Sequence, residues 1–220
     1  MEAIIERWKA IGQRIQTVQQ ESINTHPVTL IAVSKAHRAE AILPLLAAGQ
    51  AVFGENRVQE TVQKWPPLQE RYPAAELHLI GSLQTNKVKE ALSLYNAIHT
   101  IDRPKLVDAI IKEREKDEGI RCMQFFIQVN TAGEPQKGGV AVKEAARLFE
   151  YCCSLALPVT GLMCVPPANE PPAPHFTMLR DIAHEFRLPH LSMGMSGDYE
   201  TAVRLGATHV RIGTALFGAR

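Results

Sequence analysis

Lys35 directly follows a short apolar segment, residues 29–34, whose aliphatic and β-branched composition predicts a buried β-strand. Its amine therefore lies at the C-terminal edge of that strand, where a turn and a helix begin. Lysine is rarely buried in full, and partial desolvation at such a rim favours the neutral amine, whose lone pair can attack a carbonyl carbon. Lys35 is thus a candidate for forming a Schiff base.

Two glycine-containing segments near the C-terminus have the composition of a phosphate-binding site. Gly194 and Gly197 flank Ser196, and Gly213 precedes Thr214. Glycines let the backbone approach an anion closely, the hydroxyls donate hydrogen bonds, and a following helix supplies free N–H groups. The alternative is that these glycines are ordinary turn residues. A reactive lysine together with a phosphate site predicts pyridoxal 5′-phosphate (PLP) as a covalently bound cofactor.

Arg211 and Asn56 are further candidates for contacts with the cofactor. Arg211 lies two residues before Gly213, so both are expected to face the same side of their strand. A buried arginine needs a partner, which could be a carboxylate, the phosphate or a ring nitrogen. Because arginine keeps its proton, a pyridine nitrogen facing it would stay uncharged, which makes a weak electron sink. Asn56 follows the second predicted strand and could serve the site or cap a helix.

Predicted strands and helices alternate along the whole chain after a leading helix at residues 2–22. The strands are short and apolar, as expected for a parallel sheet that is buried on both faces. We predict a single-domain (β/α)8 barrel over residues 1–220 with an extra N-terminal helix; the alternative is an open doubly wound sheet. The strands are expected at 29–34, 51–54, 76–81, 97–101, 122–130, 158–165, 190–194 and 208–213, and the helices at 38–48, 56–64, 84–94, 103–117, 140–155, 173–187 and 198–205.

Some residues are expected to have structural roles only. Asp102 before Pro104 is expected to cap a helix. His78 and His209 are expected to be core histidines, and Met163, Met193 and Met195 are expected to fill the barrel.

The composition indicates where the protein acts and what it does not bind. The chain of 220 residues has 24 Lys plus Arg against 23 Asp plus Glu, so a nucleic-acid or membrane partner is not expected. The N-terminus lacks the apolar core of a signal peptide. Four cysteines without metal-ligand spacing indicate a reduced, cytoplasmic protein without a metal site. No long exposed apolar face is evident, so we expect a monomer.

From residue 29 to its end, the chain resembles the pyridoxal phosphate homeostasis proteins, which are single-domain relatives of the alanine racemase barrel. The resemblance implies a (β/α)8 barrel, a Schiff base on Lys35, a phosphate site of Ser196, Gly197, Gly213 and Thr214, and Arg211 near the ring nitrogen or the phosphate. The chain departs from the family pattern at two places, Ala36-His37-Arg38 after the lysine and Ser82. These departures affect fine contacts rather than the lysine or the phosphate site. The blocks that carry the resemblance are Ala32-Val33-Ser34-Lys35, Phe53-Gly54-Glu55-Asn56 with Val58-Gln59-Glu60, His78-Leu79-Ile80-Gly81, Leu83-Gln84-Thr85-Asn86-Lys87, Ser192-Met193-Gly194-Met195-Ser196 and Val210-Arg211-Ile212-Gly213-Thr214-Ala215-Leu216-Phe217-Gly218.

Racemisation needs two bases on opposite faces of the substrate carbon. In the alanine racemase relatives one base is the lysine and the other is a tyrosine from an additional domain. This chain ends at Arg220, and its four tyrosines fall on predicted helices or helix ends. We therefore expect a protein that buffers PLP and delivers it to PLP-dependent apo-enzymes, without efficient turnover. The alternatives are a PLP-dependent amino-acid racemase and a class I aldolase-type barrel in which Lys35 acts without a cofactor.

Overall fold

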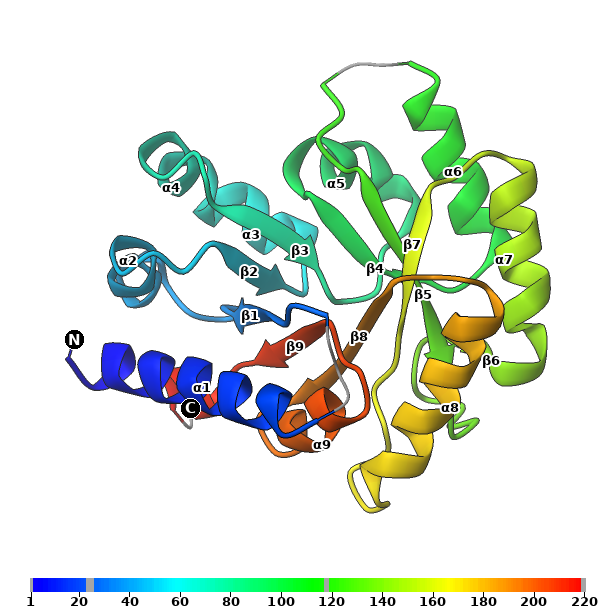
Figure 1. Ribbon diagram of the computed structural model, residues 1–220. Coiled ribbons are helices and arrows are strands. Elements are labelled where there is room, and N and C mark those ends of the chain that lie inside the picture. The colour runs from blue at the N-terminus through cyan, green and yellow to red at the C-terminus, as the bar shows by residue number, and fades with distance from the viewer. Residues whose placement is uncertain (1, 23–25, 117–118, 219–220) are drawn as a thin grey trace.

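The computed structural model describes residues 2–22, 26–116 and 119–218, and in this part of the chain eight parallel strands close into a barrel. Figure 1 shows the strands at the centre and the helices around them. The order around the barrel is β4-β3-β2-β1-β9-β8-β7-β5, and β4 pairs with β5 to close it. The barrel strands are β1 (Thr29–Val33), β2 (Val52–Glu55), β3 (Glu76–Leu79), β4 (Ala97–Ile101), β5 (Gln124–Asn130), β7 (Val159–Met163), β8 (His190–Met195) and β9 (His209–Ile212).

This arrangement confirms the predicted barrel and excludes the open sheet, and all eight strands lie where they were expected. The sequence missed β6 (Val140–Ala141), which pairs with the end of β5 and replaces the start of the helix expected at 140–155. It also missed two short helices, α4 and α10. The helices are α1 (Glu2–Gln20), α2 (Ala39–Ala47), α3 (Val58–Lys64), α4 (Pro66–Arg71), η1 (Thr85–Lys87), α5 (Val88–Leu94), α6 (Pro104–Arg114), η2 (Val142–Glu144), α7 (Ala145–Ser154), α8 (Pro172–Glu185), α9 (Tyr199–Arg204) and α10 (Thr214–Phe217).

The leading helix α1 covers the outside of the barrel where its first and last strands meet. In Figure 1 it runs below β1 and β9, beside α9. It buries Ile11, Ile15 and Val18, which recur at helical spacing and so form one apolar face. Arg7 donates a hydrogen bond from Nε to the Leu216 carbonyl (2.7 Å), which ties α1 to α10. The predicted extra helix is therefore part of the outer ring. No helix in the described residues is long and apolar enough to cross a bilayer.

Two sequence assignments are wrong. The cap of α6 is Arg103, which has an extended backbone (φ −160°, ψ 150°), whereas the Asp102 carboxylate accepts a hydrogen bond from the Arg103 guanidinium (2.5 Å). Pro104 is the first helical residue, as predicted. Met195 does not fill the barrel: it is the last residue of β8 and its side chain emerges at the rim, 36% exposed, whereas Met163 and Met193 are buried.

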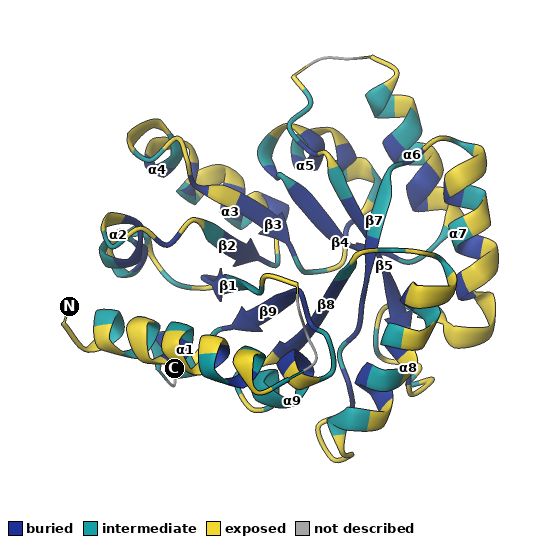
Figure 2. Ribbon diagram, in the orientation of Figure 1, coloured by how far each residue is buried: buried dark blue, intermediate teal, exposed yellow. Residues whose placement is uncertain are grey.

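Apolar side chains between the strands and the helices form the main core, and the outer faces of the helices are exposed (Figure 2). The barrel interior is different. It holds a small apolar cluster around Phe126 together with buried polar groups. His78, His99 and His209 are all buried in this interior, which confirms the expectation for His78 and His209. Burial lowers the pKa of His209 to about 3 and holds the pKa of His99 well below its usual value.

These shifts predict a pH-dependent stability. Between about pH 3 and 6.5, the unfolded chain binds a proton at His209 that the folded protein does not bind. The free energy of unfolding should therefore decrease as the pH falls through this window, by up to about 1.4 kcal/mol per pH unit for this group. Urea unfolding at several pH values should show a shallower slope for His209→Gln. The exposed His184→Gln is the control, and an unchanged slope in His209→Gln would contradict the assignment.

Candidate functional site

The pairing of β1 with β9 places the candidate lysine next to the predicted phosphate loop. Ile31 lies opposite Arg211 and Ala32 opposite Ile212 in the register. A Cβ atom built on Gly213 would lie 3.5 Å from the Cβ of Val33, two residues before Lys35. Lys35 itself is half-buried in the turn that follows β1. The structure therefore brings together the two ends of the predicted site, which are far apart in the sequence.

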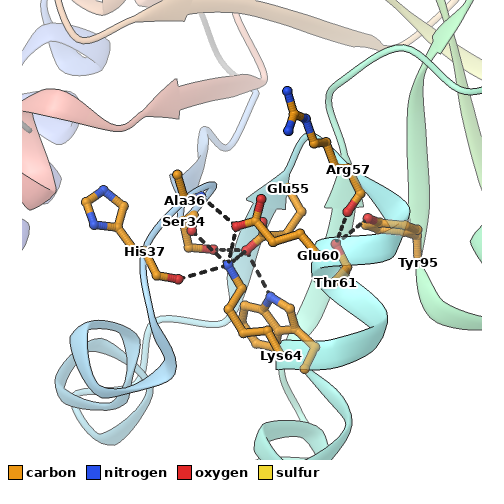
Figure 3. A network of polar contacts seen from close by, with 10 residues as sticks. Ser34, Ala36, His37, Glu55, Arg57, Glu60, Thr61, Lys64 and Tyr95 are labelled. Atoms are coloured by element: carbon orange, nitrogen blue, oxygen red, sulfur yellow. Dashed lines mark hydrogen bonds and ion pairs between the residues drawn. The ribbon is translucent and has the colours of Figure 1, made fainter.

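The turn that carries Lys35 is held by a buried ion pair (Figure 3). The Lys64 Nζ atom lies 2.8 Å from the Glu55 carboxylate, and the two side chains are 8% and 0% exposed. Lys64 also donates to the carbonyls of Ser34 (3.0 Å) and His37 (3.1 Å), and the Ser34 hydroxyl donates to Glu55 (2.6 Å). The residues on both sides of Lys35 are thus fixed to one ammonium group.

Glu60 and Trp65 complete this network. The Glu60 carboxylate accepts a hydrogen bond from the backbone N–H of Ala36 (2.6 Å) and lies 3.2 Å from Lys64 Nζ. Ala36 has a left-handed backbone (φ 59°), which a residue with a Cβ adopts only when its surroundings stabilise it. The Trp65 indole donates to Glu55 (2.9 Å). Figure 3 shows the Lys64 amine at the centre of this network, with the two carboxylates and the carbonyls of Ser34 and His37 around it.

The predicted phosphate loops contact each other directly. The Ser196 hydroxyl oxygen accepts hydrogen bonds from the backbone N–H groups of Gly213 (3.3 Å) and Ala215 (3.1 Å). Because its oxygen accepts two hydrogen bonds, the hydroxyl can still donate its own hydrogen to an anion. Gly197 has open space beside it and Thr214 is exposed. The four predicted residues therefore lie side by side at the mouth of the barrel, Ser196 and Gly197 after β8 and Gly213 and Thr214 where β9 joins α10.

Gly194 gives the first of these loops its shape. It has a positive φ of 92°, and a Cβ atom at this position would lie 2.6 Å from the Cβ of Ala202. Only glycine satisfies both constraints. The Asp198 carboxylate accepts the backbone N–H of Met195 (2.6 Å) and closes the turn.

Arg211 is buried inside the barrel, 4% exposed, and its two observed partners are neutral. Its guanidinium donates to the Ser192 hydroxyl (2.6 Å) and to the Cys164 carbonyl (2.8 Å). Desolvation lowers the pKa of Arg211. Within the described residues, no carboxylate lies within ion-pair distance of the guanidinium. A buried cation with only neutral partners fits a site that receives an anionic or electron-rich ligand.

Asn56 lines a cavity of about 440 Å³ between the start of α3 and the loop after β3. It does not cap α3, because the cap residue is Arg57, so this alternative for Asn56 is wrong. The Asn56 Oδ1 atom is buried and lacks a hydrogen-bond partner among the described residues, so a donor on a ligand would satisfy it. The cavity is lined by Asn56, Arg57, Val58, Gln59, Gly81, Ser82, Gln84 and Lys87.

The polar loop after β5 lies along another part of the mouth. Gln128 donates to the Gly138 carbonyl (2.9 Å), and Lys137 Nζ donates to the Pro166 carbonyl (3.0 Å) in the loop after β7. Lys137 also forms an ion pair with Glu134 (2.6 Å). The loop therefore bridges β5 and β7 at the rim.

Comparison with known proteins identifies the family. The family model described as "Alanine racemase, N-terminal domain" matches residues 7–220. The pyridoxal phosphate homeostasis protein of Aquifex aeolicus is 41% identical over 226 residues, which cover 98% of this chain and 97% of that protein. The chain belongs to the pyridoxal phosphate homeostasis protein family.

Solved structures agree with this family assignment. PipY of Synechococcus elongatus, solved with PLP bound, is 32% identical with a TM-score of 0.80, over 98% of this chain and all of that chain. Alanine racemase of Acinetobacter baumannii is 15% identical with a TM-score of 0.71, over 94% of this chain and 60% of that chain. The second likeness shows that the barrel fold of this homeostasis protein family is shared with the racemase.

Sequence reasoning missed the residues that hold the turn, Lys64 and Glu60, and two polar residues inside the barrel, Ser192 and His99. One signal was available, since Lys64 follows Glu60 at the helical spacing of four residues. Their contacts with β1 and β2 depend on how α3 packs, which no local spacing reveals.

The ion pair generates a stability prediction. Lys64→Met would leave the Glu55 carboxylate buried without a cation, so the free energy of unfolding should fall by about 3–5 kcal/mol. Adding Glu55→Gln to Lys64→Met should recover much of that loss in urea unfolding. The matched control is Lys116→Met, which removes an exposed ion pair with Glu113 and should cost less than about 1 kcal/mol. Equal effects of Lys64→Met and Lys116→Met would contradict this account.

Proposed function

We propose that this protein holds PLP as a reversible Schiff base on Lys35 and acts in PLP homeostasis as a carrier and buffer. The observation that carries the proposal is the closure of β1 onto β9, which sets the Lys35 turn beside the Ser196 and Gly213 loops. PLP bound to PipY supports the same cofactor here. Delivery of PLP to apo-enzymes would link the protein to amino-acid and keto-acid balance.

The covalent step uses only Lys35 and the aldehyde of PLP. The neutral amine adds to the aldehyde carbon, and two amine hydrogens leave with the carbonyl oxygen as water, so that a C=N bond replaces C=O. Hydrolysis reverses the step and releases the aldehyde, as a carrier requires. The hydrogen bonds made by Ser34, Ala36 and His37 hold the turn in place while the side chain of Lys35 reacts.

The remaining site residues bind the other parts of PLP in this proposal. The phosphate accepts hydrogen bonds from the Ser196 and Thr214 hydroxyls and from backbone N–H groups near Gly197 and Gly213. In this proposal Arg211, which lies two residues before Gly213 on β9, contacts the ring nitrogen or the phosphate. Asn56 offers its unpaired Oδ1 to a hydrogen-bond donor at the mouth.

A carrier is favoured over a racemase because two of the four tyrosines are engaged elsewhere in the fold. Tyr95 is buried between α3 and α5 with its hydroxyl on Thr61 (2.6 Å), and Tyr151 donates to Asp108 on the helical surface (2.5 Å). Without a second base, proton transfer at a substrate carbon would lose about 10²–10⁴-fold in rate.

The absorption spectrum of the purified protein tests this function. We expect a visible band that Lys35→Ala abolishes, while Lys87→Ala, which removes a different amine at the mouth, retains it. A band that persists in Lys35→Ala would contradict the proposal. Rapid α-proton exchange of amino acids in deuterated water would favour the racemase. A colourless protein that borohydride traps only with a keto-phosphate would favour the aldolase.

The phosphate loops give a second prediction. Ser196→Ala and Thr214→Ala should each weaken PLP binding, because each removes a hydrogen bond to a charged group worth roughly 1.5–3 kcal/mol. Equilibrium dialysis should therefore show about 10- to 150-fold higher Kd values. Thr214 is exposed, so its variant should keep the melting temperature. A lower melting temperature with unchanged PLP affinity would show that Thr214 is structural instead.

A further inference from the structure

A line of polar side chains runs through the barrel from Arg211 to the opposite end of the strands. Arg211 donates to the Ser192 hydroxyl (2.6 Å), which lies 2.8 Å from Nδ1 of His99. The other ring nitrogen of His99 is 3.0 Å from Nδ1 of His78. Nε2 of His78 is 3.8 Å from a Glu76 carboxylate oxygen. Four strands, β9, β8, β4 and β3, contribute one or two members each.

The two ends of this line fix the direction of its hydrogen bonds. Arg211 can only donate, so the Ser192 oxygen accepts from it. The Ser192 oxygen keeps a second lone pair, so the other end of the line decides the direction: the negative Glu76 carboxylate favours an N–H on the facing nitrogen of His78, which directs the Ser192 hydroxyl hydrogen to His99. His99 then carries its proton on Nε2 and donates to His78. His78 in turn carries its proton on Nε2, toward the negative carboxylate of Glu76. The reverse arrangement would set a lone pair of His78 against that carboxylate.

The surroundings keep both imidazoles in place and His99 neutral. His99 stacks on Phe126 with ring centroids 4.1 Å apart. Several charged and titratable groups act on the line: His209 from β9, His190 from β8, Arg121 near Glu76, and Cys164 and Asp198 near Arg211. Burial and the cationic or neutral neighbours of His99 hold its pKa far below 6.5, and the contact with His78 lowers the pKa of Glu76.

The far end of the line is open to solvent. A cavity of about 390 Å³ lies at the N-terminal ends of the strands, and both Glu76 and His78 line it. The Glu76 side chain is 54% exposed, whereas that of His78 is 3% exposed. The described residues contain no group of histidine, cysteine and acidic side chains that could hold a metal ion.

We propose that His99 and His78 are positioning residues for Arg211: with the negative Glu76 carboxylate at the end of the line, they hold one tautomer and so orient Ser192 and the guanidinium toward the cofactor. The effect on the cofactor rests on the proposed function, whereas the tautomers belong to the protein alone. A substitution of Glu76, at the opposite end of the barrel, should therefore change the orientation of the Arg211 guanidinium.

The first test measures the ring nitrogens of the histidines by ¹⁵N NMR in the protein without PLP. At pH 7.5 we expect Nε2 of both His99 and His78 to carry a proton, with His99 neutral. Glu76→Leu should change this pattern, because the negative charge that favours the tautomer is lost. The pattern should also change as acid protonates Glu76. His99 protonated on Nδ1, or a pattern indifferent to Glu76, would overturn the proposal.

The second test measures PLP affinity by dialysis. His99→Phe keeps the stacking on Phe126 but removes both ring nitrogens, and we expect about tenfold weaker binding. Glu76→Leu lies on the surface and should fold, and we expect about threefold weaker binding. His190→Phe alters the same layer of rings and is the matched control. His190 acts on the line only through its charge and, in the described part of the chain, makes no hydrogen bond with its members, so this variant should bind PLP normally.

The outcomes separate the two claims. If the wild-type protein fails to bind PLP, the proposed function is wrong, and the NMR result still decides the tautomers. If the wild type binds PLP and Glu76→Leu binds it with equal affinity, the positioning role is wrong. Equal weakening in Glu76→Leu and His190→Phe would also overturn it, since the effect would then belong to the layer as a whole.

Discussion

The pairing of β1 with β9 is the contact on which the candidate site depends. A parallel barrel closes only when its first and last strands meet, and here that contact sets Ile31 opposite Arg211 and Val33 against Gly213. The amine-bearing turn and the phosphate loops thereby become neighbours although almost the whole chain separates them. α1 covers this seam from outside and is tied to α10 through Arg7. Packing of the N-terminal helix therefore bears directly on the geometry of the mouth.

Two lysines near the seam differ in burial. Lys64 is buried among oxygen atoms of Glu55, Glu60 and two backbone carbonyls, so its ammonium group is stabilised and holds the turn. Lys35 projects from that turn, half-buried at the mouth. Burying the Lys64 and Glu55 charges beneath the turn costs desolvation free energy. The ion pair and its hydrogen bonds offset that cost. Inside the barrel, Arg211 is held instead by two neutral groups, the Ser192 hydroxyl and the Cys164 carbonyl.

The sequence predicted the strands and the mouth well and the supporting contacts poorly, for physical reasons. Strands buried on both faces appear as apolar runs, and the residue after each run must lie at the mouth, which located Lys35, Ser196 and Gly213. Short elements such as α4 and β6 contain too few residues for a periodic pattern. The ion pair between Lys64 and Glu55 was missed because it depends on how α3 packs against β1 and β2. Met195 was misplaced because β8 carries its last residue past the rim.

Borohydride reduction followed by peptide mass spectrometry tests the central claim most directly. Reduction converts a C=N bond between PLP and an amine into a stable C–N bond and marks the lysine that carried the cofactor. The closure of β1 onto β9 predicts that the PLP-bound protein yields one modified peptide, with the adduct on Lys35. An adduct on Lys64, Lys87 or Lys137, or no adduct in protein that retains PLP, would contradict the account.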